Sequence, residues 1–180
     1  MKILLASGSP RRLALLRGLG HEVTVVKPDF DESRITLSDP ALLVTALAVG
    51  KGRSVRPPAG MLLVAADTVV CCEGRILGKP ADEKEAFAVL RMLSGRTHNV
   101  FTGVYLERDG KNICFTDCAE VRFRDLSDQE ILGYIATGSP FDKAGGYGVQ
   151  DSDFVAEITG SYHNVMGFPT ERFEELCGSI

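Results

Sequence analysis

The N-terminal segment 4–12 strongly limits how this chain can begin to fold. An apolar strand ends there in a turn of small residues, and the turn leads directly into a helix that starts with two arginines. Ser9 suits the N-cap, and Pro10 suits the first helical position because its missing N–H is not needed there. The exposed N–H groups of that helix end, beside Arg11 and Arg12, would form a favourable site for a polyphosphate.

A simpler interpretation of this segment stays open. A strand followed by a turn and a proline-led helix is common, and an arginine pair often lies on a solvated helix face. The segment is not a P-loop, because the chain contains no G-x-x-x-x-G-K-[ST]. It also lacks the glycine spacing of the dinucleotide fingerprint. Anion binding therefore needs support from other parts of the chain.

The remaining pattern alternates strands and helices and then adds a hairpin around Asp109-Gly110. A capping box at Ser127-x-x-Glu130 opens a late helix. We expect an α/β fold with a mixed β-sheet flanked by helices, in one domain spanning residues 1–180. The predicted strands are 3–6, 22–26, 61–72, 76–77, 98–108, 111–124 and 154–158, and the predicted helices are 10–19, a helix from 40, 82–94, 127–138 and a helix from 170.

Composition narrows the function classes. The net charge of −4 argues against a nucleic-acid binder that relies on an overall positive field, so a local basic site suggests a small anionic ligand. The five cysteines include no C-x-x-C pair, and their odd number suits a reducing cytoplasm better than a disulfide framework. No apolar run reaches the length of a membrane span or a signal-peptide core, so we expect no membrane partner.

Four polar residues interrupt apolar or turn-forming sequence: Glu32, Lys51, Asp67 and Lys79. Asp67 is the most informative, since a carboxylate inside an apolar strand is costly unless it is paired, hydrogen-bonded or metal-bound. Taken singly, Glu32 suits a solvated loop, Lys51 a snorkelling side chain and Lys79 an ordinary turn. Taken together, carboxylates and cations are what a metal-dependent phosphoanhydride hydrolase needs, with Mg²⁺ or Mn²⁺ on the carboxylates and the cations on the phosphates.

The C-terminal half carries a glycine-rich segment, 142–150. Its glycines allow positive φ or close backbone approach. Lys143 could reach a phosphate, and Gln150 could read a base edge with its paired donor and acceptor. The alternative is a glycine-rich turn with a buried Asp142–Lys143 pair. His163, in the polar loop that follows, has no histidine partner at ligand spacing, so we expect it to be structural.

Assembled in order, these segments resemble the Maf family of nucleoside triphosphate pyrophosphatases. The resemblance implies an α/β fold with a cleft between two lobes, often a homodimer, and metal-dependent hydrolysis between the α- and β-phosphates. It extends over nearly the whole chain and is carried by Ala6-Ser7-Gly8-Ser9-Pro10-Arg11-Arg12, Glu32, Lys51, Ala66-Asp67-Thr68, Gly78-Lys79-Pro80, Ser94-Gly95-Arg96-Thr97-His98, Asp142-Lys143-Ala144-Gly145-Gly146-Tyr147-Gly148 and the segment 160–169.

The resemblance also implies roles for individual residues. Asp67 would accept the proton of the attacking water, and Glu32 would hold the metal with a share from Asp67. Among the remaining site residues, Lys51 and Lys79 are expected to be catalytic, and Ser7, Arg11, Arg12, Thr68, Lys143 and Gln150 to bind substrate.

Three positions resemble the subgroup that acts on dTTP and UTP: Arg11, Thr68 and Gln150. The sister subgroup, which acts on 7-methyl-GTP, typically has glutamine in place of Thr68 and glutamate in place of Gln150. An amide can serve the O4 and N3–H of uracil or thymine, whereas a carboxylate accepts from a guanine edge. One departure is the short segment Asp151-Ser152-Asp153, which replaces a glycine-containing loop and adds two carboxylates beside Gln150.

Two further functions stay open at this point. A nucleotide-binding regulator of cell division, the role behind the idea of septum inhibition, could use the same cleft but would not need Glu32 and Asp67 to activate water. An inosine triphosphate pyrophosphatase of related fold is less favoured, since the N-terminal turn lacks the Asn and Lys of that family.

Overall fold

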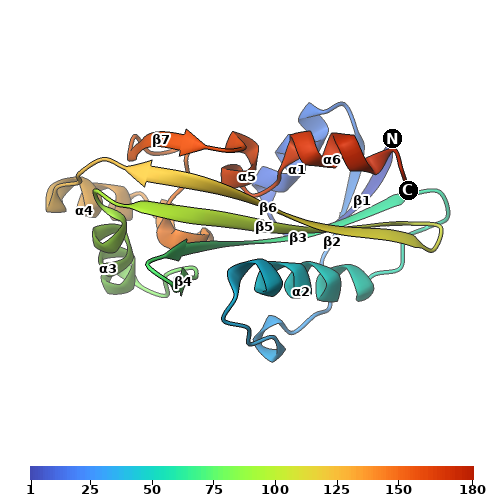
Figure 1. Ribbon diagram of the computed structural model, residues 1–180, viewed down its shortest axis with the longest axis horizontal. Coiled ribbons are helices and arrows are strands. Elements are labelled where there is room, and N and C mark those ends of the chain that lie inside the picture. Colours follow the sequence, from blue (N-terminus) through green and yellow to red (C-terminus); the bar gives the residue numbers. More distant parts are fainter. The chain divides into compact units, whose positions relative to one another are not determined.

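A computed structural model describes residues 1–180 and confirms the mixed α/β class. Figure 1 shows a sheet with helices on both faces. The strands are β1 (Lys2–Ala6), β2 (Glu22–Val26), β3 (Leu62–Cys72), β4 (Arg75–Leu77), β5 (Thr97–Arg108), β6 (Lys111–Phe123) and β7 (Val155–Thr159). The α-helices are α1 (Pro10–Gly18), α2 (Pro40–Arg53), α3 (Glu83–Leu93), α4 (Asp128–Ala136), α5 (Tyr162–Met166) and α6 (Thr170–Cys177), with short 3₁₀ helices η1 (Glu32–Arg34), η2 (Ser139–Asp142) and η3 (Ala144–Gly146).

The strand order in the sheet is β2-β1-β3-β5-β6-β7, and β4 pairs with β3. β1 is parallel to both β2 and β3, whereas β3–β4 and β6–β7 are antiparallel. The chain divides into two compact units: unit 1 comprises Met1–Thr68, Thr102–Asp117 and Gly167–Ile180, and unit 2 comprises Val69–Phe101 and Cys118–Met166. A cleft between two lobes stays a prediction.

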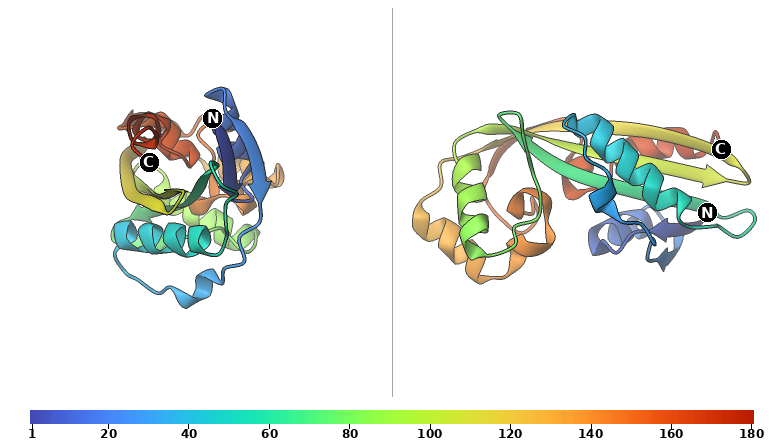
Figure 2. Two further views of the ribbon diagram at one scale, coloured as in Figure 1. Left: turned by 90° about the vertical axis from the view of Figure 1, so that its right-hand side faces the viewer. Right: turned by 90° about the horizontal axis from the view of Figure 1, so that it is seen from below.

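Unit 1 is built on the parallel strands β2, β1 and β3. Side chains alternate between the two faces of each strand, because successive residues of a strand point in opposite directions. In β3, Leu62 and Val64 join the core beneath α1 and α6, and Leu63 and Ala65 join the core beneath α2. Figure 1 shows α2 on the opposite side of these strands from α1 and α6, and Figure 2 shows it running alongside them. Both faces are therefore covered, as parallel sheets require.

The close contact between α2 and β5 in unit 1 depends on a glycine. A Cβ at Gly103 would lie 2.4 Å from the carbonyl oxygen of Val44 in α2. No side chain fits at that distance, so glycine lets the helix lie directly on the strand. The position of α2 matters for the site, because the last turn of this helix carries Lys51.

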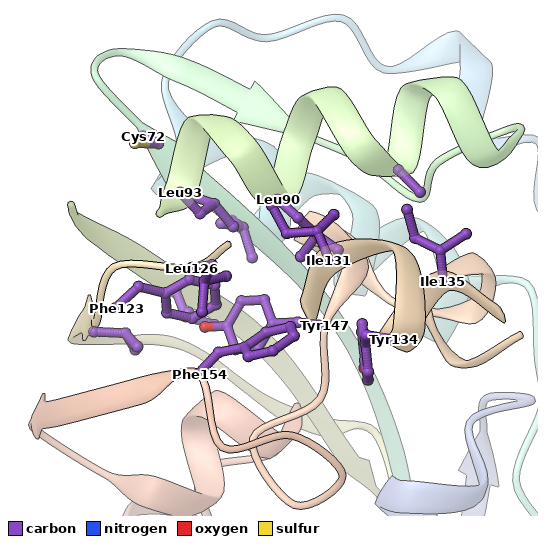
Figure 3. Close-up of a cluster of buried hydrophobic side chains, with 14 residues drawn as sticks. Cys72, Leu90, Leu93, Phe123, Leu126, Ile131, Tyr134, Ile135, Tyr147 and Phe154 are labelled. Carbon is purple, nitrogen blue, oxygen red and sulfur yellow. The ribbon is translucent and has the colours of Figure 1, made fainter. Parts of the chain in front are cut away.

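Unit 2 has its own core, in which aromatic rings pack edge to face (Figure 3). The Phe123 and Tyr147 rings lie 4.6 Å apart at 77°, beneath aliphatic side chains of α3 and α4 such as Leu90 and Ile131. His98 is buried in this core, and its Nε2 lies 2.7 Å from the Tyr147 hydroxyl. The hydrogen bond ties β5 to the end of the glycine-rich segment. No helix of the protein combines the length and apolarity needed to cross a bilayer.

Candidate functional site

The order β2-β1-β3 creates a change of direction in the sheet at β1. The connection through α1 leads to one neighbour of β1, and the connection through α2 leads to the other. In open α/β sheets, ligands bind beyond the carboxyl ends of strands at such a point. β1 ends at Ala6, which pairs with Ala65 of β3, so Asp67 and Thr68 lie just past the end of β1. The N-terminal turn that leads into α1 therefore lies near Asp67 and Thr68, the polar residues of β3.

Asp67 lies on the α2 face of β3 and contacts Lys51. The Lys51 ammonium donates a short hydrogen bond to Asp67 Oδ1, and it also lies 3.0 Å from Glu32 Oε1. The side chains of Lys51 and Asp67 are only 10% and 12% exposed, whereas that of Glu32 is 56% exposed. Lys51 is therefore not a snorkelling lysine. Its buried ammonium group contacts both of the predicted metal-binding carboxylates, Glu32 and Asp67.

Glu32 reaches this position from the short helix η1. Asp31 caps that helix, since its side chain accepts a hydrogen bond from the backbone N–H of Ser33 at 3.1 Å. The Ser33 hydroxyl donates to the same oxygen at 2.6 Å, and these two hydrogen bonds from Ser33, the hydroxyl one above all, hold the pKa of the Asp31 carboxyl below its usual value. The sequence predicts only a loop here, yet the cap defines the local backbone that carries Glu32.

Thr68 lies on the opposite face of β3 and contacts Arg12 of α1. The Arg12 guanidinium donates to Thr68 Oγ1 at 3.0 Å, to Ser7 Oγ at 3.1 Å and to the carbonyl of Gly167 at 2.9 Å. Thr68 Oγ1 also shares a hydrogen bond with Thr102 Oγ1 at 2.9 Å. Arg12 is thus a buried connector between the N-terminal turn, β3 and the segment before α6. Burial lowers its pKa, while the charges of Asp67 and Glu32 act in the opposite direction.

The N-terminal turn has the predicted capping geometry. Ser9 adopts the extended N-cap conformation and its side chain accepts from the Arg12 N–H at 3.4 Å, with Pro10 at the start of α1. Ser7 Oγ accepts from the Ser9 N–H at 3.2 Å and is buried. Arg11, half-buried, lies next to Pro10 in the first turn. The predicted anion-binding groups of unit 1 therefore surround one helix end.

Unit 2 holds the other three predicted residues. The Lys143 ammonium is almost buried and donates to Asp142 Oδ1 and to the carbonyl of Ser139, both at 2.7 Å. It also lies 3.2 Å from Asp151 Oδ2. The Asp142–Lys143 pair that the sequence left open as an alternative is therefore present, but only Lys143 is buried, since the Asp142 side chain is 57% exposed. A direct contact between Lys143 and phosphate stays a prediction.

Lys79 and Gln150 are both exposed. The turn that carries Lys79 packs on the glycine-rich segment, where the Gly145 N–H donates to the carbonyl of Gly78 at 3.0 Å. Gly145 needs its positive φ of 71° to do so. Gln150 lines an open hollow of about 710 Å³ in unit 2, together with residues of α4 and the segment 151–154. That these residues share one pocket with those of unit 1 stays a prediction.

Several contributors were missed by sequence reasoning. Gly167, Thr102, Ser139 and Tyr134 all supply contacts to predicted residues. Only Gly167 carried a signal, since it lies in the segment 160–169 that shares in the family resemblance; it adopts a φ of 113°, which glycine adopts readily. Asp151 was noted as an added carboxylate, without its contact to Lys143.

The donor set fits a small divalent cation only in part. No group of three or more His, Cys, Asp or Glu side chains is arranged to hold a metal ion. Glu32 and Asp67 supply two carboxylates, and both of them pair with Lys51. Mg²⁺ is commonly held by one or two carboxylates, with water and substrate phosphates completing the octahedron. The pair suits a cation that arrives with a nucleotide better than one bound permanently.

Comparison with known proteins gives consistent results. A family model described as Maf-like protein matches residues 2–180. A protein of Symbiobacterium thermophilum named dTTP/UTP pyrophosphatase is 45% identical over 179 residues, which cover 97% of this chain and 92% of the relative. One of Thermococcus gammatolerans with the same name is 45% identical and covers 97% and 94%. The solved Ham1 protein of Staphylococcus aureus, at 13% identity, a TM-score of 0.50 and coverage of 69% and 73%, shares the fold.

Proposed function

Because the chain belongs to the Maf family, we propose that it hydrolyses nucleoside triphosphates between the α- and β-phosphates, with dTTP and UTP as preferred substrates. The products are the nucleoside monophosphate and pyrophosphate. The observation that carries the proposal is the contact of Lys51 with both Asp67 and Glu32, beside Thr68, the next residue of β3, which accepts a hydrogen bond from the buried Arg12. The two relatives reported above align with this chain over 92% and 94% of their own length, and both are named dTTP/UTP pyrophosphatase.

In the proposed reaction, Asp67 Oδ accepts a proton from the water that attacks the phosphorus atom. The carboxylate is shielded from bulk solvent and held by Lys51, so it keeps one orientation toward the attacking water. A divalent cation on Glu32 and Asp67 would neutralise phosphate charge and lower the pKa of bound water. Arg11, Lys51 and Lys79 would stabilise the charge that develops on the phosphate chain. Arg12 and Ser7 would hold the N-terminal turn in place.

Base preference is proposed to depend on Thr68 and Gln150. The Thr68 hydroxyl accepts from Arg12, so its influence on the base would act through the position of that guanidinium. Gln150 is exposed over the hollow in unit 2 and offers both a donor and an acceptor. These features support pyrimidine nucleotides, including modified ones, over 7-methyl-GTP.

We also propose a cytoplasmic location and a homodimer. All five cysteines are free thiols, in keeping with a reducing compartment. The homodimer is proposed because proteins of this family are often homodimers, and light scattering of the purified protein would test it.

Product analysis tests the reaction. We expect the purified protein with Mg²⁺ or Mn²⁺ to convert dTTP and UTP to monophosphate and pyrophosphate, and to act more slowly on 7-methyl-GTP and ITP. Release of orthophosphate with a diphosphate would exclude the proposed bond. The variant Asp67→Asn should lose at least about a hundredfold in kcat.

Asp109→Asn is the matched control for that variant. It makes the same chemical change in the same unit, at a hairpin position where Asn-Gly is as favourable as Asp-Gly. Its turnover should stay near that of the unchanged protein. An Asp67→Asn enzyme with full turnover would exclude Asp67 as the proton acceptor.

A further inference from the structure

Asp151, which is not among the predicted site residues, lies at the centre of a hydrogen-bond network in unit 2. Its Oδ1 accepts from the Tyr134 hydroxyl at 2.8 Å, and its Oδ2 accepts from the Ser139 hydroxyl at 2.5 Å. The same Oδ2 lies 3.2 Å from the Lys143 ammonium. Burial opposes its ionisation, but these hydrogen bonds and the Lys143 charge outweigh that effect, and the pKa of Asp151 lies below its usual value. The carboxylate is therefore charged and held on both oxygens.

The contacts of Asp151 close a loop of chain. Tyr134 belongs to α4, Ser139 begins η2, and Lys143 is the second residue of the glycine-rich segment. The Tyr134 hydroxyl, which donates to Asp151, also accepts from the Gly148 N–H at 3.0 Å. The Asp151 N–H in turn donates to the carbonyl of Gly148 at 3.3 Å. Both ends of the segment 148–151 are thus fixed to α4.

Gly148 shows how tightly this arrangement is packed. A Cβ at that position would lie 2.5 Å from Asp151 Oδ1 and 2.9 Å from Lys143 Cε. Since φ of Gly148 is not in the left-handed region, its missing side chain serves the contact and not the backbone. The glycine therefore makes room for the ion pair between Asp151 and Lys143.

Gln150 lies inside the segment that this network holds. Its side chain and that of Asp151 line the same hollow, together with Tyr134. A glutamine amide pairs with the O4 and N3–H of uracil in one orientation and with the edge of cytosine in the reverse orientation. Discrimination between uracil and cytosine therefore requires that the amide be held in one orientation.

We propose that Asp151 is a positioning residue for base recognition, which holds Gln150 through Tyr134, Ser139 and Lys143. The proposal rests on the proposed function, because it assigns Gln150 to the base of the nucleotide. Asp151 acts on the base through its neighbour and does not enter the hydrolysis itself. Its loss should alter which nucleotide binds well while the chemical step continues.

The test compares Asp151→Asn with Asp128→Asn. Asp128 lies in the same unit but outside the lining of the hollow, its side chain is 71% exposed, and it pairs with Arg91 instead of Lys143. We expect Asp151→Asn to raise KM for UTP about tenfold with kcat within about twofold, and to reduce the preference for UTP over CTP about tenfold. Asp128→Asn should change neither. An unchanged preference in Asp151→Asn would overturn the proposal.

A second variant guards against simple misfolding. Gly148→Ala keeps every charge but displaces the Asp151–Lys143 pair, and it should shift the preference in the same direction. Calorimetric binding of α,β-methylene UTP and its CTP analogue gives the same comparison without turnover. If the unchanged protein hydrolyses no triphosphate, the proposed function fails, yet the binding preference still decides the role of Asp151. An equal loss of affinity for both analogues would overturn it.

Discussion

Lys51 donates a hydrogen bond to Asp67 and forms an ion pair with Glu32 from a position almost fully removed from solvent. A buried ion pair of this kind contributes little net stability, because desolvation offsets the attraction between the charges. A buried lysine in the mostly apolar helix α2 is better explained by chemistry than by folding. The ammonium holds the carboxylates of Asp67 and Glu32 close together, although their negative charges repel each other.

Substitutions at Lys51 and Asp67 should separate stability from function. Lys51→Met leaves Asp67 buried without its main partner and should lower the free energy of unfolding by about 3 kcal/mol. Lys51→Met combined with Asp67→Leu removes both charges and should recover most of that loss. Urea unfolding measures the stability, and turnover of UTP measures function. Activity that returned with stability in the double variant would contradict a catalytic role for the pair.

The sequence singled out Asp67, Thr68, Arg12 and Lys51 as unusual positions, but it did not show which residues each of them contacts. Asp67 and Thr68 are neighbours in the chain, yet the strand directs them to α2 and α1 respectively. Arg12 finds partners 56 and 155 residues away, which no local pattern indicates. Such contacts depend on the packing of α1 and β3 and become visible only in three dimensions.

At the scale of elements, local signals predicted most helix starts. Ser9 and Ser127 cap α1 and α4, and the Asp109-Gly110 turn joins β5 to β6. The short helices η1, η2, η3 and α5 were not predicted. Helices this short are stabilised by their surroundings more than by their own sequence, so their positions depend on tertiary contacts.

The buried His98 links the glycine-rich segment to β5 and should make stability depend on pH. Burial lowers its pKa from 6.5 to about 4, so the folded protein keeps the ring neutral where the unfolded chain binds a proton. Its contribution is fully present above pH 6.5 and is lost as pH falls toward 4.

We therefore expect the free energy of unfolding to fall by about 2 kcal/mol from pH 7 to pH 5 on account of this ring. The variant His98→Gln should lose that part of the pH dependence, measured by urea unfolding at both pH values. Equal pH dependence in both proteins would show that His98 is not the responsible group.

At the scale of the whole molecule, the predicted mixed sheet and flanking helices are confirmed, and the family model extends over residues 2–180. The division into two compact units follows contacts between segments far apart in sequence, so composition and linkers gave no sign of it. Three long strands, β3, β5 and β6, contribute residues to both units.

The response of the whole protein to metal follows from its two-carboxylate site. Removal of divalent cations with a chelator should abolish turnover and leave the melting temperature of the nucleotide-free protein unchanged, since Lys51 already pairs with both Glu32 and Asp67. Metal together with a non-hydrolysable nucleotide at about 100 times its Kd should stabilise the fold by about 2.7 kcal/mol. A chelator-induced drop in melting temperature without nucleotide would indicate a resident metal instead.

The alternation along β3 has a consequence for how such a protein can diversify. The peptide bond after Asp67 separates a residue that contacts Lys51 on one face of the strand from Thr68, which contacts Arg12 on the other face. An exchange at position 68 therefore changes one side of the strand while Asp67 on the other side keeps its environment. Under the proposed roles of Thr68 and Asp67, single substitutions would alter substrate choice without changing the proton acceptor.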